Sequence, residues 1–286
     1  MFGVVGDLLE DVVVRLSGPP ALGSDTPARI SRVRGGSAAN VAAAAAATGA
    51  AVRFIGRVGD DALGEQLKAE LTAAGVDVRV QRQGTTGSVV VLVGPDGERT
   101  MLPDRAAAAQ LDVIDRRWLT DLTWLHVPSY SLLVDPIGTC SVDAIRQVQA
   151  AGGRVSIDVS SVGPVRAFGV PRFTAMLHDL APDVVFANAH EAAVVDLGHV
   201  SGGWTTVVKC GPDPVRVFPA DRSSAGAAFD VPVPPVDGVV DSTGAGDAFA
   251  AGFLMARLGG ADDAGAVRDG INLAARTLTG AGAALR

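Results

Sequence analysis

The chain has 286 residues and a formal net charge of −7, with 48% apolar and 19% charged residues. These values are typical of a folded globular protein with a sizeable core, and they exclude a disordered chain. The negative charge argues against a nucleic-acid or anionic-membrane surface, so we expect small-molecule partners. The two cysteines, Cys140 and Cys210, lie far apart without metal-site spacing, which favours reduced thiols and a cytoplasmic location.

The N-terminal third predicts strands that do not fit a parallel sheet. The first residues, MFGVVGDLLEDVVV, carry acids where an export signal has basic residues, and they predict a strand. Segments near 11–16, 28–35 and 78–103 show strand alternation or a hairpin signal, the last through GSVVVLVG and ERTMLP joined by PDG. We predict that they form a small antiparallel β lid over a ligand site. Its exposed edges could pair with a second copy, giving a homodimer through the lid.

The Ala-rich stretch NVAAAAAATGAAV at 40–52 predicts a packed helix, because it is shorter than the roughly 20 apolar residues that span a bilayer. After residue 120 the chain alternates short apolar runs with segments of helical period. Strands followed by helices in this way indicate a doubly wound, mostly parallel sheet, so the fold class is α/β. The strands are expected at 123–127, 154–160, 183–188 and 205–211, with helices at 141–152, 171–180 and 190–197.

Several common chemistries are excluded. Neither lysine, Lys68 or Lys209, follows a glycine, so there is no G-x-x-x-x-G-K-[ST] phosphate loop. The sequence has no H-E-x-x-H, C-x-x-C or G-x-S-x-G, which removes the common zinc-protease, redox and hydrolase motifs. GAGDAF lacks the third glycine of a dinucleotide fingerprint and comes late in the chain, so hydride transfer is disfavoured.

The most informative stretch is DSTGAGDAF at 241–249. A helix with an apolar face begins at about Gly246 or Asp247, and its first turn offers the amides of Ala245, Gly246 and Asp247 to an anion. An acid in such a cradle would repel phosphate, but it could take a proton from an attacking hydroxyl. The alternative is that Asp247 is an ordinary first-turn acid that favours the helix dipole.

A second stretch, GGSAAN at 35–40, leads from an alternating strand into the Ala-rich helix. Gly35 and Gly36 would let the backbone approach a ligand closely, and Asn40 offers a donor and an acceptor to sugar hydroxyls. Alternatively, Ser37 caps the helix and Asn40 is solvated.

Together, GGSAAN and DSTGAGDAF resemble the two signatures of the PfkB/ribokinase family of carbohydrate kinases, in the same order and about 200 residues apart. The resemblance extends over nearly the whole chain, through the acid in VVGDLLED, the N-x-x-E motif in FANAHEA and the strand and turn of VVKCGP. It implies a single ribokinase-like α/β domain over 1–286, and ATP- and Mg²⁺-dependent phosphorylation of a hydroxyl on a small sugar or sugar derivative.

The resemblance also implies roles for single residues. Asp247 would be the general base, and Gly244, Ala245 and Gly246 would form the anion hole. Sugar binding is implied for Asp11, Gly35, Gly36 and Asn40; nucleotide binding for Asn188, Glu191, Lys209, Gly211 and Gly282; Mg²⁺ binding through water for Glu191; and K⁺ binding for Asp241 and Thr243.

Several of these residues also suit ordinary structural roles. Asn188 and Glu191 are typical of a solvated helix start, Lys209 of a strand-end surface charge, and the segment from Asp241 to Thr243 of a helix lead-in. Arg105, after the lid hairpin, could bind a phosphate or carboxylate of the substrate, or be solvated.

The sequence departs from the family pattern at three places. The run Ala106–Ala108 stands where ribokinase-like chains often read G-A-N, Ser160 stands where sugar-acid kinases often carry Asn, and Pro214 replaces a turn glycine. The acceptor therefore stays open. A nucleoside kinase of the same fold is one alternative, and it would need an aromatic or apolar slot for the base beside Asp11. The other is a catalytically silent relative that binds sugar or nucleotide.

Overall fold

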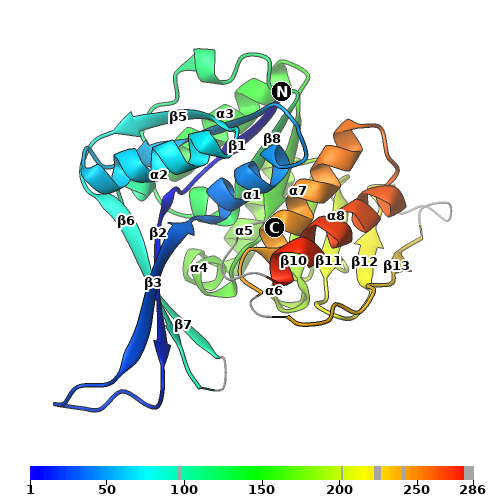
Figure 1. The fold of residues 1–286 in the computed structure, drawn as a ribbon. Coiled ribbons are helices and arrows are strands. Elements are labelled where there is room, and N and C mark those ends of the chain that lie inside the picture. The colour runs from blue at the N-terminus through cyan, green and yellow to red at the C-terminus, as the bar shows by residue number, and fades with distance from the viewer. Residues whose placement is uncertain (96–97, 201, 222–226, 240–241, 280–286) are drawn as a thin grey trace.

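The computed structural model describes residues 1–95, 98–200, 202–221, 227–239 and 242–279 (Figure 1). A large, mostly parallel sheet has helices on both faces, and a smaller sheet projects from this body. The predicted α/β fold class is confirmed. Within the described ranges, no helix has the length and apolarity needed to cross a membrane.

In the described part of the chain, nine strands form the large sheet in the order β13-β12-β11-β10-β9-β8-β1-β4-β5. All neighbours from β11 to β5 are parallel, and β12 and β13 add an antiparallel edge. The order reverses between β1 and β8, and ligands of such sheets bind at the carboxyl ends of strands beside a reversal. The strands are β1 (Phe2–Val5), β4 (Val52–Val58), β5 (Asp77–Arg82), β8 (Trp124–Pro128), β9 (Arg154–Asp158), β10 (Val184–Asn188), β11 (Thr205–Lys209), β12 (Val215–Phe218) and β13 (Phe229–Val231).

The helices cover the two faces of this sheet and give two separate cores. On β10, Phe186 packs on one face with its ring centroid 5.2 Å from that of Phe253, while Val185 joins the core of the other face. Because both faces are covered, the central strands are continuous apolar runs. One face carries α1 (Ser37–Ala46), α2 (Ala62–Ala73), α7 (Ala245–Leu258) and α8 (Asp263–Leu278); the other carries α3 (Ile137–Ala150), α4 (Val162–Phe168), α5 (Val170–Leu180) and α6 (Ala189–Val195).

The smaller sheet, called the lid below, contains β2 (Leu9–Leu16), β3 (Ala28–Gly35), β6 (Thr86–Val93) and β7 (Arg99–Ala106) in the order β3-β2-β6-β7. Its strands extend away from the helices and the large sheet (Figure 1). The outer pairs are antiparallel as predicted, but the central pair, β2 with β6, is parallel. These two strands leave the body in the same direction because α1, β4, α2 and β5 lie between them in the chain.

Two boundaries differ from the predictions. Residues 78–82, predicted within the lid, belong to β5 and pair with β4 of the large sheet, because Val78 and Val80 pack against its core. The predicted N-terminal strand is two strands, β1 and β2, separated by a turn at Gly6 with φ +155°. A Cβ at Gly6 would lie 2.7 Å from both the Ala38 Cβ and the Ser131 Oγ, so helix α1 packs closely only against a glycine.

Candidate active site

Most of the candidate site residues lie at one edge of the large sheet, where its parallel strands end. Asp158, Asn188 and Lys209 are the last residues of β9, β10 and β11, and Asp7 follows β1. The first turn of α7, with Asp247, faces this edge. Because adjacent parallel strands end together, side chains far apart in the sequence converge here.

The Asp247 carboxylate accepts hydrogen bonds from two polar side chains of the GGSAAN segment, Ser37 and Asn40. Ser37 Oγ donates to Oδ1 at 2.7 Å, and Asn40 Nδ2 donates to Oδ2 at 3.0 Å. Asn40 is oriented in turn by Arg34, whose Nη1 donates to Asn40 Oδ1 at 3.2 Å. Burial raises the pKa of Asp247 from 3.8 to about 6, against the two hydrogen bonds that lower it. The structure therefore brings the two signature segments together at one carboxylate.

The backbone before Asp247 makes only part of the predicted amide cradle. Gly244 has φ +75°, a left-handed conformation that suits glycine, and it precedes the first helical residue. The Ala245 amide donates to the Ser242 carbonyl at 3.2 Å, and the Ala248 amide is bonded to the Gly244 carbonyl. Within the described residues, the amides of Gly246 and Asp247 have no backbone acceptor outside the helix. Of the predicted amides at 245–247, those of Gly246 and Asp247 are therefore the candidates for an anion site.

A buried ion pair lies beside this cradle. Lys209 Nζ is 2.6 Å from Asp158 Oδ2, and it lies 3.3 Å from where a Cβ on Gly246 would be. Burial alone would lower the pKa of Lys209, but the Asp158 carboxylate outweighs it and the pKa is raised. Lys209 is therefore a fixed cation next to the backbone of Gly246, and it is not a solvated strand-end charge.

Asn188 and Glu191 form a capping box at the start of α6. The Glu191 amide donates to Asn188 Oδ1, while the Asn188 amide and Nδ2 donate to the two Glu191 carboxylate oxygens, all at 2.8 Å. Glu191 is buried, which raises its pKa, and Asp158 adds to that effect. Glu191 is thus buried at this helix start, while Asn188 is exposed. Gly211, with φ +63°, forms the turn after β11.

The glycine pair at 35–36 allows two chain segments to approach each other. A Cβ on Gly35 would overlap the Asp11 carboxylate, and a Cβ on Gly36, where φ is +97°, would overlap the Asp7 carbonyl oxygen. Asp11 is buried on β2, and burial together with the charge of Asp247 raises its pKa from 3.8 to about 6. The glycines thus keep Asp11 and α1 close to the site.

Two arginines of the lid contact the body. Arg105 binds Asp7 through two parallel hydrogen bonds, Nε to Oδ2 at 2.7 Å and Nη2 to Oδ1 at 2.8 Å. Arg99 Nη1 donates to Thr243 Oγ1 at 2.6 Å. Thr243, which was predicted as a K⁺ ligand, accepts this hydrogen bond. The other predicted K⁺ ligand, Asp241, and the nucleotide candidate Gly282 lie outside the described residues.

Sequence reasoning missed several polar residues at this edge. Tyr130 follows β8 in the 3₁₀ turn Ser129–Ser131; burial raises its pKa, and the charges of Glu191, Asp247 and Asp7 add to the rise. The only sequence signal for these missed residues was their position, at the end of a predicted strand or next to or within a signature segment. The missed residues are Asp7, Arg34, Ser37, Tyr130 and Asp158.

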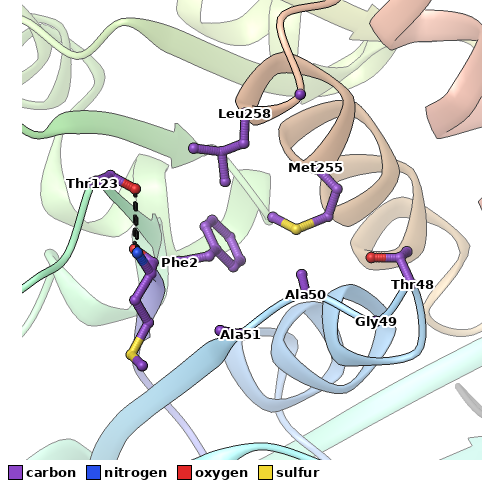
Figure 2. Close-up of a pocket in the computed structure, with 10 residues that line it drawn as sticks. Phe2, Thr48, Gly49, Ala50, Ala51, Thr123, Met255 and Leu258 are labelled. Atoms are coloured by element: carbon purple, nitrogen blue, oxygen red, sulfur yellow. Dashed lines mark hydrogen bonds between the residues drawn. The ribbon is translucent and has the colours of Figure 1, made fainter.

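A pocket of about 470 Å³ lies away from these candidate site residues. It is bordered by the start of β1 and the carboxyl ends of α1 and α7, at Phe2, Ala50, Met255 and Leu258 (Figure 2). No acidic, basic or imidazole side chain lines it. Since chemistry of the kind the sequence predicts needs titratable groups, the Asp247 edge is the candidate active site.

Comparison with known proteins identifies the family. The pfkB family of carbohydrate kinases matches residues 4–285. The chain is 34% identical to an ATP-dependent ribose-1-phosphate kinase of Halopiger xanaduensis over 85% of this chain and 80% of the relative. It is 30% identical to a fructokinase of Klebsiella pneumoniae over 88% of this chain and 82% of that protein.

Solved structures of other kinases share the fold. The structure of an adenosine kinase from Sinorhizobium meliloti superposes with a TM-score of 0.85 at 22% identity, covering 99% of this chain and 94% of the other. This likeness supports the ribokinase-like fold and, at that identity, no more than the fold. The protein belongs to the pfkB family of carbohydrate kinases, and it is an ATP-dependent carbohydrate kinase.

Proposed function

We propose that the protein transfers the terminal phosphoryl group of ATP to a hydroxyl of a small sugar or sugar derivative, with Asp247 as the general base. The observation that carries this proposal is the carboxylate of Asp247 in the first turn of α7, next to the amides of Gly246 and Asp247, which have no backbone acceptor outside the helix among the described residues. Phosphoryl transfer needs a base for the hydroxyl and preorganised donors for the phosphoryl oxygens. One helix start offers both.

Asp247 is suited to take a proton because its ionised form is held in place. Ser37 and Asn40 donate to its two oxygens, and a pKa of about 6 leaves it mostly ionised at neutral pH while keeping it a stronger base than an exposed aspartate. The proton of the sugar hydroxyl would pass to this carboxylate as the oxygen attacks phosphorus.

The charge that develops on the phosphoryl group would be stabilised by the amides of Gly246 and Asp247, with Gly244 setting the turn that exposes them. The Lys209 ammonium, beside Gly246, would add a full positive charge. Asp158 would act as a positioning residue, since it holds Lys209 at 2.6 Å. The Ala245 amide, already bonded to Ser242, would contribute less than the sequence predicts.

The acceptor would bind between the lid and α1. Asp11 and Asn40 offer a buried carboxylate and an amide to sugar hydroxyls, and Gly35 and Gly36 keep these groups within reach of Asp247. Arg105 would anchor the base of the lid through Asp7, since two of its donor groups bind that carboxylate.

The nucleotide would lie along the ends of β10 and β11, near Asn188, Glu191, Lys209 and the turn at Gly211. The residues fit a hydrated Mg²⁺: each Glu191 oxygen accepts one hydrogen bond from Asn188 and retains a lone pair for a metal-bound water. When bound, Mg²⁺ neutralises phosphate charge. Glu191 would orient its waters, and ATP use together with the free thiols of Cys140 and Cys210 supports a cytoplasmic location.

We propose that residues 1–286 form one domain with the lid as an excursion, and that the lid joins two copies into a homodimer. The lid face that turns away from Asp11 carries several apolar side chains, including Ile30 and Leu102, which are 63% and 52% exposed. A second copy of the same sheet would cover them. The apolar residues of this face are Val12, Val14, Ile30, Val90, Leu92 and Leu102, and the strand register places Glu10, Arg32, Ser88 and Thr100 on the same face.

Replacement of Leu92 by Asp is expected to convert a dimer into a monomer, because a carboxylate cannot be buried unpaired in an apolar interface. Native mass spectrometry or light scattering measures this. Val113→Asp, at an exposed residue outside the lid, is the control and should leave the mass unchanged. A monomeric wild-type protein would contradict the proposed dimer.

The test of the reaction is turnover of Mg·ATP with a panel of pentoses, hexoses, ribosides and ribose 1-phosphate, with phosphorylated product identified by mass spectrometry. Formation of one phosphorylated product per ADP is the expected result. Binding of a panel member without any product would instead favour the catalytically silent alternative.

The activity is expected to fall as the pH is lowered through about 6. Asp247 and Asp11 both have a pKa raised to about 6; Asp247 must be ionised to accept a proton, and Asp11 is a stronger acceptor for a sugar hydroxyl when it is ionised. The logarithm of kcat/KM should therefore be flat above about pH 7 and fall below about pH 6 with a slope between about 1 and 2. In Asp11→Asn the slope should be about 1. A profile that stays flat to about pH 5 would exclude a base with this pKa.

A further inference from the structure

A second pocket lies under the lid, beside Asp11. It is enclosed on one side by the inner lid face and on the other by the loop that leads into α7, and Arg99 and Thr243 meet at its far end. Its lining residues are Asp11, Val13, Val33, Val91, Val93, Arg99, Met101 and Thr243.

The wall of this pocket is apolar because of the strand register. Val13 on β2 lies opposite Val91 on β6, and Val91 lies opposite Met101 on β7, so their side chains share one face. Val91 and Val93 are buried within the small apolar cluster of the lid. Between Asp11 at one end and Arg99 with Thr243 at the other, five lining side chains offer no hydrogen bond.

Such a wall fits a free sugar poorly. A pentose or hexose carries a hydroxyl on most of its carbons, and each hydroxyl turned to the valines would lose water without gaining a partner, at a cost of roughly 1–3 kcal/mol. A phosphate group fits poorly as well, since it would face the Asp11 carboxylate with Arg99 as the sole cation among the lining residues. A planar heterocycle has two apolar faces for the valines and a polar edge for Arg99.

We propose that the acceptor is a riboside, in which Asp11 binds the sugar hydroxyls and a planar heterocyclic group lies against Val13, Val33, Val91, Val93 and Met101. This rests on the proposed function and adds the class of acceptor to it. It also supplies the apolar slot beside Asp11 that a nucleoside-type kinase requires.

The slot is closed in the present arrangement. Its free volume is about 30 Å³, room for about one water molecule, and the hydrogen bond from Arg99 to Thr243 spans its far end. The heterocycle therefore enters as the β7 side of the lid moves off the α7 loop, and its polar edge takes the place of Thr243 as a partner of Arg99. The lid then binds the part of the acceptor that does not react.

The first experiment compares kcat/KM for ribose, fructose, ribose 1-phosphate, adenosine, cytidine and aminoimidazole riboside at fixed Mg·ATP. We expect at least one riboside to exceed every acceptor without a heterocycle by about tenfold or more, the effect of burying an aromatic face. A higher value for ribose, fructose or ribose 1-phosphate overturns the riboside inference and leaves the kinase intact. No turnover of any acceptor overturns the proposed function as well.

The second experiment tests the wall itself. Met101→Asn places a polar group at a lining residue that is 55% exposed, so the variant should fold, and Val91→Thr adds a hydroxyl at nearly constant volume. Each should lower kcat/KM for the preferred riboside about fivefold or more, mainly through KM, while kcat/KM for ribose changes less than twofold. The control is Val113→Asn, a similar change at an exposed valine outside the lid. Equal losses for riboside and ribose, or no loss, would overturn the inference.

Discussion

Replacing Asp247 by Asn is expected to lower turnover by roughly 10²- to 10⁴-fold, the usual contribution of a general base, while ATP binding is largely retained. Asn has nearly the shape of Asp and can still accept the hydrogen bond from Ser37 Oγ, so the start of α7 should persist. It cannot take a proton from the acceptor. Single-turnover rates with the best acceptor of the panel, and ATP affinity by calorimetry, measure the two effects separately.

The matched control is Asp263→Asn, because Asp263 is a first-turn acid on the neighbouring helix α8. Both changes remove one favourable charge from a helix start, worth about 0.3–1 kcal/mol at an exposed site. If Asp247 acted only on the helix dipole, the two variants would have similar turnover. Near-normal turnover of Asp247→Asn would therefore refute the assignment of the base.

Removing the Asp158 carboxylate is expected to have the largest effect on stability. Asp158→Ala leaves the Lys209 ammonium buried without its partner, and breaking one side of a buried ion pair costs about 3–5 kcal/mol. Turnover should fall as well, because Lys209 would no longer be held beside Gly246. The free energy of unfolding from urea titration gives the first effect and steady-state kinetics the second.

Two comparisons make this prediction specific. Asp230→Ala breaks an exposed pair with Arg216, where solvent screening should make the loss of stability far smaller. The double variant Asp158→Ala with Lys209→Met removes both charges and should recover much of the lost stability without recovering turnover. A cost for Asp158→Ala no larger than that for Asp230→Ala would contradict a structural ion pair at Lys209.

The elements that the sequence predicted correctly have local signals. The apolar runs after residue 120 are strands of the large sheet because both faces are covered, and the glycine before α7 is in the left-handed conformation that its helix start requires. The segment 78–82 has the same alternation as a lid strand, and nothing local separates the two cases. Packing of Val78 and Val80 against the core assigned it to β5.

The active-site contacts had no such signals. Ser37 and Asp247 are 210 positions apart, and Asp7 and Arg105 are 98 positions apart. The glycines at 35 and 36, for which the sequence predicted a close approach to a ligand, also allow a close approach to Asp11 and Asp7. A pattern of residue types identifies which groups are available, but which groups meet depends on strand order.

The sequence by itself determined the α/β fold and the helix start that presents Asp247, because both depend on short-range patterns of apolar spacing and glycine conformation, and the resemblance of its two signatures indicated the family. Only the tertiary structure decided that Lys209 is paired with Asp158, that Arg99 and Arg105 tie the lid to the body, and that an apolar slot lies beside Asp11. Those contacts arise because the parallel strands end at a common edge of the large sheet and because strand β7 of the lid contacts residues at that edge. The signature residues are thus recognisable from local patterns, while the contacts among them depend on long-range packing.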